Sequence, residues 1–273
     1  MSLKITRRAF VGAGCCAAAT CAVDGLAVEP SWLEVTEHDV PVAGLPRALD
    51  GFRIAHLSDL HLRALGGVHD KAASAVRSHG ADLVVMTGDS IEDEGALGAL
   101  EELCRRLAAP GREVVATLGN WEHWGHVPLR RLGEAYARAG ARLLGNESTL
   151  LRSGIAVVAT DDFCSGHDDV ESALSRAPAS PVRLFLTHAP GLFDRLPAGA
   201  PRFDLGLAGH THGGQIRALG VPVWVPPGSG RFRSGMYATE RGPVYVSRGV
   251  GTSVLPARLT CRPELALFRL IAG

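Results

Sequence analysis

The sequence has no excess of charge of either sign: its 273 residues include 28 Lys and Arg against 28 Asp and Glu. A balanced chain has no electrostatic basis for binding nucleic acid or an anionic membrane surface. It also lacks a cysteine framework, because Cys104, Cys164 and Cys261, the cysteines beyond residue 27, are odd in number and show no paired spacing. Beyond residue 27 there is no apolar run long enough to span a bilayer, no repeat and no low-complexity tract. What remains is a globular chain whose function has to be read from its motifs.

The beginning of the chain has the pattern of an export signal. Arg7 and Arg8 precede an uncharged run over residues 11–23 that is too short to cross a bilayer, and small residues up to Ala27 offer a cleavage site. Two arginines in this position resemble a twin-arginine signal, which carries a folded protein through the membrane. An ordinary secretory signal and a retained anchor are the alternatives. We therefore predict that residues 1–27 are a signal peptide read by the twin-arginine export machinery, and that the protein works in the periplasm or cell envelope.

The remainder, residues 28–273, alternates between short apolar runs and helical patterns. The apolar runs have the length of buried strands and cover residues 52–57, 83–87, 114–118, 155–159, 182–187 and 205–208. Helical patterns lie between several of them, over residues 68–79, 96–109 and 129–139. Strands that alternate with helices predict a layered α/β fold, and nothing in the pattern marks a domain boundary.

Less regular segments flank this region. Residues 32–37 alternate like an edge strand. After Gly213, prolines and glycines separate short apolar runs at 223–225, 244–247 and 265–270. We expect these runs to form antiparallel strands that finish a second sheet.

Polar side chains follow most of the apolar runs, at the point where each predicted strand ends. They are Asp59 and His61 after the first run, Asp89 after the second, Asn120 after the third, His188 after the fifth, and His210 and His212 after the sixth. In layered α/β folds ligands gather at the carboxyl ends of the strands. Each residue taken alone has a structural explanation, as a helix cap, a glycine turn or a core histidine. The whole series in this order predicts a common site.

The last of these motifs, Gly209-His210-Thr211-His212, is the one around which the rest is arranged. If the backbone stays extended here, the two imidazoles point the same way and can face one site. Gly209, Gly213 and Gly214 leave room for a tight turn beside it. Because imidazole is the commonest metal-binding side chain, the pair favours a divalent transition ion. The alternative is a polar turn with two exposed histidines.

Taken together, these motifs resemble the calcineurin-like metallophosphoesterase superfamily, and within it a twin-arginine-exported bacterial phosphodiesterase group. That group is similar to UDP-2,3-diacylglucosamine pyrophosphatases. The resemblance covers nearly all of residues 32–270, and it is sharpest at residues 57–61, 87–89, 209–215 and 246–253. It implies two packed mixed β-sheets flanked by helices, a four-layer αββα sandwich.

The resemblance also implies a site with two divalent ions, which can be Mn, Fe or Zn. One ion would be held by Asp59, His61, Asp89 and His212, and Asp89 would bridge to a second ion held by Asn120, His188 and His210. A bridging carboxylate lets two cations lie close together. The implied activity is hydrolysis of a phosphoester, most simply a phosphodiester, by a metal-activated hydroxide. Its substrate would be a small phosphate ester, a lipid or a cell-wall component.

Two other functions stay open at this point. A pyrophosphohydrolase of UDP-sugar lipids would use the same ligands, although such substrates are usually made on the cytoplasmic side while the signal points outward. A metal-free binding module on the same fold belongs to another class, but it would be expected to have lost ligands.

The chain departs from the family pattern next to Asn120. The family usually has His at the following position, where this sequence has Trp121. Trp121 has no titratable proton, so His123 is a candidate to replace the missing histidine, with Glu122 positioning it. The alternative is that His123 only supports the loop. With Asp89, His123 completes the predicted catalytic residues.

Several other residues have weaker assignments. Asp161 and Asp162 could shape the pocket or only stabilise a strand end. Arg248 could face an anionic substrate or form a salt bridge with a carboxylate. Trp121, Trp124 and Trp224 could line a groove, but we expect core packing for them.

We predict that replacing both Arg7 and Arg8 with Lys blocks export and leaves uncleaved precursor in the cytoplasm, because a twin-arginine signal needs both guanidinium groups. Cell fractionation and immunoblotting measure this outcome. Export of the double-lysine protein at the level of the unchanged protein would rule out the twin-arginine interpretation.

Overall fold

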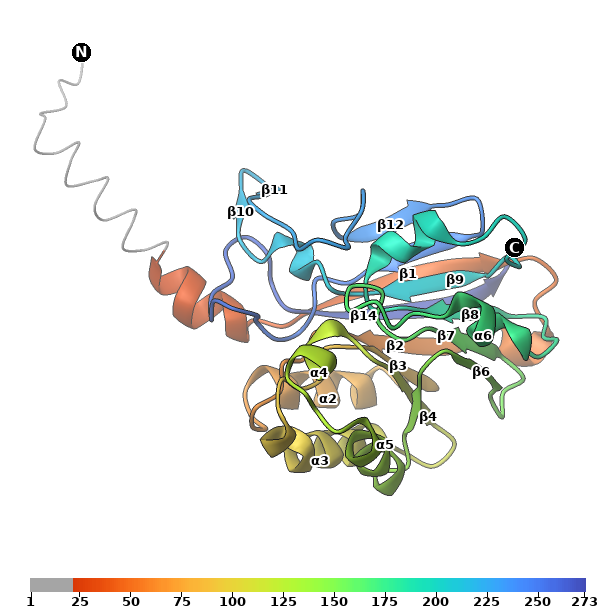
Figure 1. Cartoon of the computed structure of the whole chain (residues 1–273), viewed down its shortest axis with the longest axis horizontal. Coiled ribbons are helices and arrows are strands. Elements are labelled where there is room, and N and C mark those ends of the chain that lie inside the picture. The colour runs from red at the N-terminus through yellow and green to blue at the C-terminus, as the bar shows by residue number, and fades with distance from the viewer. Residues whose placement is uncertain (1–21) are drawn as a thin grey trace, which may run out of the picture.

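The computed structural model describes residues 22–273 (Figure 1), so the twin-arginine motif and most of the predicted apolar run lie outside the described residues. The first described residues pack on the rest of the chain. The Gly25 carbonyl accepts a hydrogen bond of 2.8 Å from the Arg258 N–H. Glu29 is buried, and its carboxylate accepts the N–H groups of Thr260 and Cys261. Cleavage after Ala27 stays a prediction.

The first of two large sheets has six strands in the order β1-β14-β2-β3-β4-β5. They are β1 (Glu34–Val42), β14 (Glu264–Ala272), β2 (Arg53–Leu57), β3 (Leu83–Thr87), β4 (Glu113–Thr117) and β5 (Arg142–Leu144). Strands β2 to β5 are parallel, while β14 runs antiparallel to β2 and parallel to β1.

The second sheet also has six strands, in the order β12-β13-β9-β8-β7-β6. They are β12 (Gly235–Ala238), β13 (Pro243–Val246), β9 (Leu205–Ala208), β8 (Arg183–Leu186), β7 (Ala156–Ala159) and β6 (Glu147–Leu150). Strands β13, β9, β8 and β7 are parallel, and the outer strands β12 and β6 are antiparallel to their neighbours. A small hairpin, β10 (Arg217–Ala218) and β11 (Val221–Pro222), stands apart from both sheets (Figure 1).

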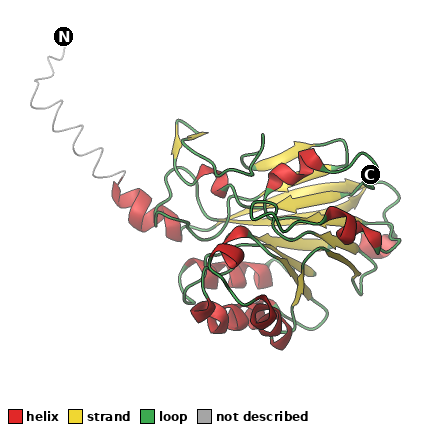
Figure 2. Cartoon of the chain, viewed as in Figure 1, coloured by secondary structure: helices red, strands yellow, loops and turns green. Residues whose placement is uncertain are grey.

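Helices cover the outer faces of the two sheets (Figure 2). The helices α2 (Val68–Ser78), α3 (Leu97–Leu107) and α5 (Leu129–Arg138) lie on the first sheet. The short helix α6 (Val170–Ser175) and the 3-10 helix Pro190–Arg195 lie on the second. The remaining helix, α4 (Asn120–Trp124), follows β4 directly. Within the described part of the chain, no helix has the length and apolar character that crossing a membrane requires.

Successive side chains along each strand point to opposite faces of the sheet, and together they form three apolar layers. In β3, Val84 and Met86 join the core under the helices, whereas Leu83 and Val85 join the core between the sheets. Successive strand residues point to opposite faces, so a strand buried on both faces must be apolar throughout. The predicted architecture of two packed mixed sheets flanked by helices is therefore confirmed.

Before Gly213 the predicted elements agree with the structure to within a residue or two, except that the edge strand expected at 32–37 forms as β1 and continues to Val42. The predictions after Gly213 differ more. The run at 265–270 does not finish the second sheet; as part of β14 it lies inside the first, between β1 and β2. The physical reason is that its residues are buried on both sides, with Leu265 facing the helical core and Phe268 the core between the sheets. Residues 223–225 form no strand, because Pro222 and Pro226 on either side cannot donate to a ladder.

Candidate metal centre

The topology brings polar residues from both sheets to one place. Strands β2, β3 and β4 are parallel in the first sheet, as are β8 and β9 in the second, so their carboxyl ends each form one edge. The two edges meet: His188 Nε2, after β8, lies 3.1 Å from Asp89 Oδ2, after β3. His212 Nε2, after β9, lies 3.4 Å from Asp59 Oδ1, after β2. The site is thus assembled across the sandwich.

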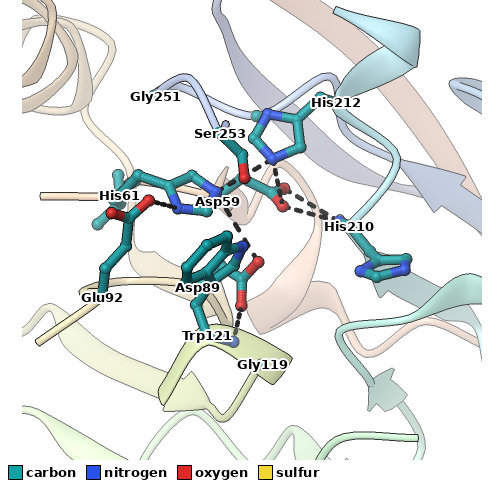
Figure 3. A network of polar contacts seen from close by, with 12 residues as sticks. Asp59, His61, Asp89, Glu92, Gly119, Trp121, His210, His212, Gly251 and Ser253 are labelled. Atoms are coloured by element: carbon teal, nitrogen blue, oxygen red, sulfur yellow. Dashed lines mark hydrogen bonds and ion pairs between the residues drawn. The ribbon is translucent and has the colours of Figure 1, made fainter. Parts of the chain in front are cut away.

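One group of possible ligands consists of Asp59, His61 and His212, all buried, with ligand atoms within 4.8 Å of one another. His61 Nε2 lies 3.1 Å from His212 Nε2. Figure 3 shows these three side chains turned toward one another. Two imidazole nitrogens this close can share at most one proton, so their lone pairs converge on a common point that suits a cation.

A second group consists of Asp89, His188 and His210, which are also buried and within the same 4.8 Å limit. His210 Nδ1 lies 3.2 Å from His188 Nε2. Asp89 Oδ2 is also 3.8 Å from His61 Nε2, so this carboxylate faces both groups. Burial by itself would raise the pKa of Asp89, but His188, His61 and the Trp121 N–H lower it to about 2, which keeps the carboxylate ionised.

Three of the four histidines have their second ring nitrogen held by an oxygen atom. His61 Nδ1 is 2.9 Å from Glu92 Oε1, and His188 Nδ1 is 2.7 Å from the Thr87 carbonyl. His210 Nε2 is 2.7 Å from the Pro227 carbonyl. These oxygens accept the N–H of each ring, so the other nitrogen faces the site and offers its lone pair to an ion once it gives up its proton. This is the usual support for metal-ligating histidine.

Asn120 gives an independent indication that the site fits metal ions. Its Oδ1 atom is buried and has no hydrogen-bond partner. Buried polar atoms are nearly always paired, and this orphaned carbonyl oxygen, whose residue lines the same cavity as Asp89 and His210, needs a donor or a cation as its partner. A divalent cation is such a partner. The donor set of carboxylate, amide oxygen and imidazole is therefore suited to two ions.

The backbone around the site is unusual. Five of its residues have positive φ values: Asp59 (50°), His61 (43°), Asp89 (51°), His210 (69°) and His212 (48°). The extended backbone expected for His210 and His212 is therefore wrong, and the two imidazoles join different groups. Non-glycine residues in this region cost free energy, and such residues cluster at functional sites.

The segment at 246–253, one of the sharpest matches in the sequence, packs directly behind Asp59. Gly251 N donates to the Asp59 carbonyl at 2.7 Å, and Val250 N donates to the Ser58 carbonyl at 3.0 Å. Gly249 has φ 72°, and a β-carbon there would lie 2.7 Å from Asp59 Cβ. Only glycine gives the backbone this conformation and this approach. The buried Arg258 holds the segment by donating to the carbonyls of Gly249 and Gly251.

Glu122 has a structural role that differs from the expected one of positioning His123. Its carboxylate makes no hydrogen bond to the His123 side chain; it is buried and accepts the backbone N–H groups of Asp89, Ser90, Ile91 and Gly119. This ties the loop after β3 to the loop after β4. Burial and the nearby Asp89 charge raise the pKa of Glu122 to about 7.

His123 lies on α4, and its ring forms a hydrogen bond and a stacking contact with two residues that follow β7. Its Nε2 is 2.7 Å from Asp161 Oδ1, and its ring stacks on His167 with centroids 4.0 Å apart. The hydrogen bond to Asp161 raises the pKa of His123. Asp161 thus orients the imidazole. A part for His123 in catalysis stays a prediction.

Two of the weaker assignments are now decided. Trp124 and Trp224 are 54% and 64% exposed, so the expectation that the tryptophans serve core packing is wrong for them. They line a cavity beside the ligand groups, together with the half-buried Trp121. Arg248 forms salt bridges with Glu34 at 3.0 Å and Glu264 at 2.9 Å, which is the second of its two interpretations.

Other supporting residues had no sequence signal. Glu92, Arg258 and the backbone carbonyls of Thr87 and Pro227 act through tertiary contacts. Cys164 Sγ lies 3.3 Å from His210 Nε2, and among the described residues all three cysteines are free. Thr87 belongs to the matched residues 87–89, but its identity does not set the role of its backbone carbonyl. Glu92, Cys164, Pro227 and Arg258 stand outside the motifs that carry the ligands, so the local pattern could not identify these contacts.

Comparison with known proteins identifies the family of the chain. The family model for calcineurin-like phosphoesterases matches residues 52–214. The chain is 32% identical to the metallophosphoesterase YkuE of Bacillus subtilis, over 89% of this chain and 87% of that protein. It is 30% identical to the phosphodiesterase YaeI of Escherichia coli, over 98% of this chain and 100% of that protein. A dimetal phosphatase from Danio rerio aligns over 81% of this chain and 93% of its own, with 12% identity and a TM-score of 0.47.

The chain therefore belongs to the calcineurin-like phosphoesterase family. It is a metallophosphoesterase, that is, a hydrolase, with two groups of residues that can each hold a metal ion. The metal-free binding module is accordingly set aside.

We expect Asp161→Asn to lower the pKa of His123 by removing the charge that favours the imidazolium, as an NMR titration of the ring would show. The raised pKa means that the pair stabilises the folded state at pH values below the ordinary histidine value of 6.5, and that this contribution is lost as the pH rises through the raised pKa. The exposed Glu171→Gln is the matched control. An unchanged titration of His123 in Asp161→Asn would contradict this account.

Proposed function

We propose that the protein is an exported, dinuclear metal-dependent phosphodiesterase. The observation that carries the proposal is the pair of buried ligand groups that share access to Asp89. The name of the full-length relative YaeI, a phosphodiesterase, supports the diester as substrate. The Arg7-Arg8 sequence supports export to the periplasm or cell envelope by the twin-arginine machinery. An outward-directed signal also disfavours the pyrophosphohydrolase of UDP-sugar lipids.

The ligand atoms can be assigned from the hydrogen bonds. One ion would take Asp59, His61 Nε2, Asp89 and His212 Nε2; the second would take Asp89, Asn120 Oδ1, His188 Nε2 and His210 Nδ1. Asp89 would bridge the two. Mixed imidazole and oxygen ligation suits Mn, Fe and Zn.

Two divalent ions at these ligands would polarise a phosphoryl group and lower the pKa of water bound beside it. The protein's own groups set the geometry for this chemistry. The backbone N–H of Trp121 donates a hydrogen bond of 2.9 Å to Asp89 Oδ1, and the backbone N–H of His210 donates one of 2.9 Å to Asp59 Oδ1. These bonds orient both carboxylates toward the site without protonating them. Burial of the ligand groups excludes bulk water and strengthens their interaction with charge.

Asp89→Asn tests the bridge, because it keeps the size of the side chain and removes the charge that lets two cations lie close together. We expect the loss of at least one ion per chain and a fall in kcat/KM on the order of a hundredfold or more. Mass spectrometry of the metals and hydrolysis of an aryl phosphodiester measure the two effects, and circular dichroism checks the fold. The exposed Asp50→Asn serves as the control. Two bound ions with full activity in Asp89→Asn would exclude Asp89 as the bridge.

Substitutions at Trp121 and His123 test how the leaving group is protonated. If the family histidine is missing at Trp121, activity should depend strongly on leaving-group acidity, since general acid help is worth roughly a hundred- to ten-thousand-fold. Trp121→His should then raise turnover of alkyl esters and change little on nitrophenyl esters. His123→Ala should show the reverse if His123 replaces the missing group. Equal rates for both variants across leaving groups, at equal metal content, would show that neither residue takes part in proton transfer.

A further inference from the structure

We propose that the substrate is an amphiphile, in which one substituent of the phosphodiester is an aliphatic chain that lies in an apolar groove beside the metal centre. This rests on the proposed function and adds the substrate class to it. The groove is a cavity of about 390 Å³, which is the size of a small-molecule site. We call it the apolar groove and define it by Trp121, Trp124, Val223, Trp224, Val254 and Leu255.

The apolar groove is continuous with the metal centre. Asp89, Asn120, His210 and His212 line the same cavity. A phosphoryl group held at these residues would therefore have one of its substituents directed along the groove. Trp121 joins the two parts, because its ring packs edge-on against His61 at 5.9 Å and against Trp124 at 6.0 Å.

The walls of the apolar groove expose large apolar side chains to water. Val223 is 68% exposed, Val254 is 83% exposed, and Leu255 is 55% exposed. A concentration of such side chains around a cavity marks a binding surface, because single exposed apolar residues are common but patches are not. Among the described residues that line the cavity, Asp89 is the only carboxylate, and there is no Lys or Arg. The groove thus offers nothing to a second phosphate or to a charged sugar, and a favourable surface to methylene groups.

The wall of the groove at Val254 is held in its exposed position by hydrogen bonds. Val254 has φ 63°, a strained value for a β-branched residue. The Gln215 side chain accepts the Ser253 N–H at 3.0 Å and donates to the Leu255 carbonyl at 2.9 Å, so it clamps the chain on both sides of Val254. Gln215 follows the ligand-bearing loop at His212. The same segment that carries the metal ligands therefore also holds the apolar wall.

Hydrolysis of a series of alkyl nitrophenyl phosphodiesters by the metal-loaded protein tests the proposal, because the leaving group stays constant while the alkyl chain grows from methyl to octyl. Full burial of a methylene is worth about fourfold in affinity, so a half-open groove should give about twofold per methylene. We expect kcat/KM to rise about a hundredfold over the series. Trp224→Ser and Val254→Ser should flatten this rise. Leu150→Ser, at an apolar position on β6 that is 50% exposed and lies outside the groove, should leave it unchanged.

A rise of less than tenfold would overturn the proposal, as would a steep rise that both groove variants retain. In either case hydrolysis of the methyl ester would leave the proposed function intact. If no ester is hydrolysed, the proposed function fails. A binding measurement then tests whether the groove takes an aliphatic chain. Calorimetry would then compare octyl phosphate with methyl phosphate, and equal affinities would overturn the assignment of the groove.

Discussion

The site depends on the contact between carboxylates of one sheet and histidines of the other. His188 faces Asp89 at 3.1 Å, and His212 faces Asp59 at 3.4 Å. Two ionised carboxylates buried at one place repel each other and lose their hydration, which no protein tolerates without compensation. The imidazoles compensate in part, and the orphaned Asn120 oxygen needs a donor or a cation as its partner there as well. Divalent ions held by these residues would complete this arrangement.

The surroundings of the site are organised to hold this arrangement against its own strain. Backbone groups at Asp59, Asp89 and His210 adopt left-handed conformations that cost free energy. Glu122 secures the loops after β3 and β4 through four backbone N–H groups. Arg258 secures the segment behind Asp59 in the same way from the opposite side. Buried charged side chains used as backbone clamps fix the ligands more tightly than loops of this length would alone.

The apolar groove follows from the same loops. The chain after His212 cannot return to the second sheet directly, because Pro222, Pro226 and Pro227 remove backbone donors. It forms the β10–β11 hairpin and an exposed loop instead, and this loop carries Trp224 to the mouth of the site. His210, His212 and Trp224 thus belong to one segment, so the segment that carries two of the candidate ligands also forms part of the apolar groove.

The sequence by itself determined the layered fold and indicated the candidate ligands, six of which the structure brings into two groups. A continuous apolar run such as Leu83–Thr87 predicts a buried strand, because a strand buried on both faces has to be apolar along its length. Polar residues directly after such runs are readable because parallel strands end at one edge. It did not determine that β14 enters the first sheet, since an apolar run carries no information about its pairing partner. The local pattern of the motif also did not show that His210 and His212 separate into two groups, which only the family resemblance implied. That outcome depends on left-handed backbone at the ligands, which is held by tertiary contacts from Glu122, Gly249, Arg258 and the facing sheet. Tertiary contacts of this kind leave no local pattern in the sequence.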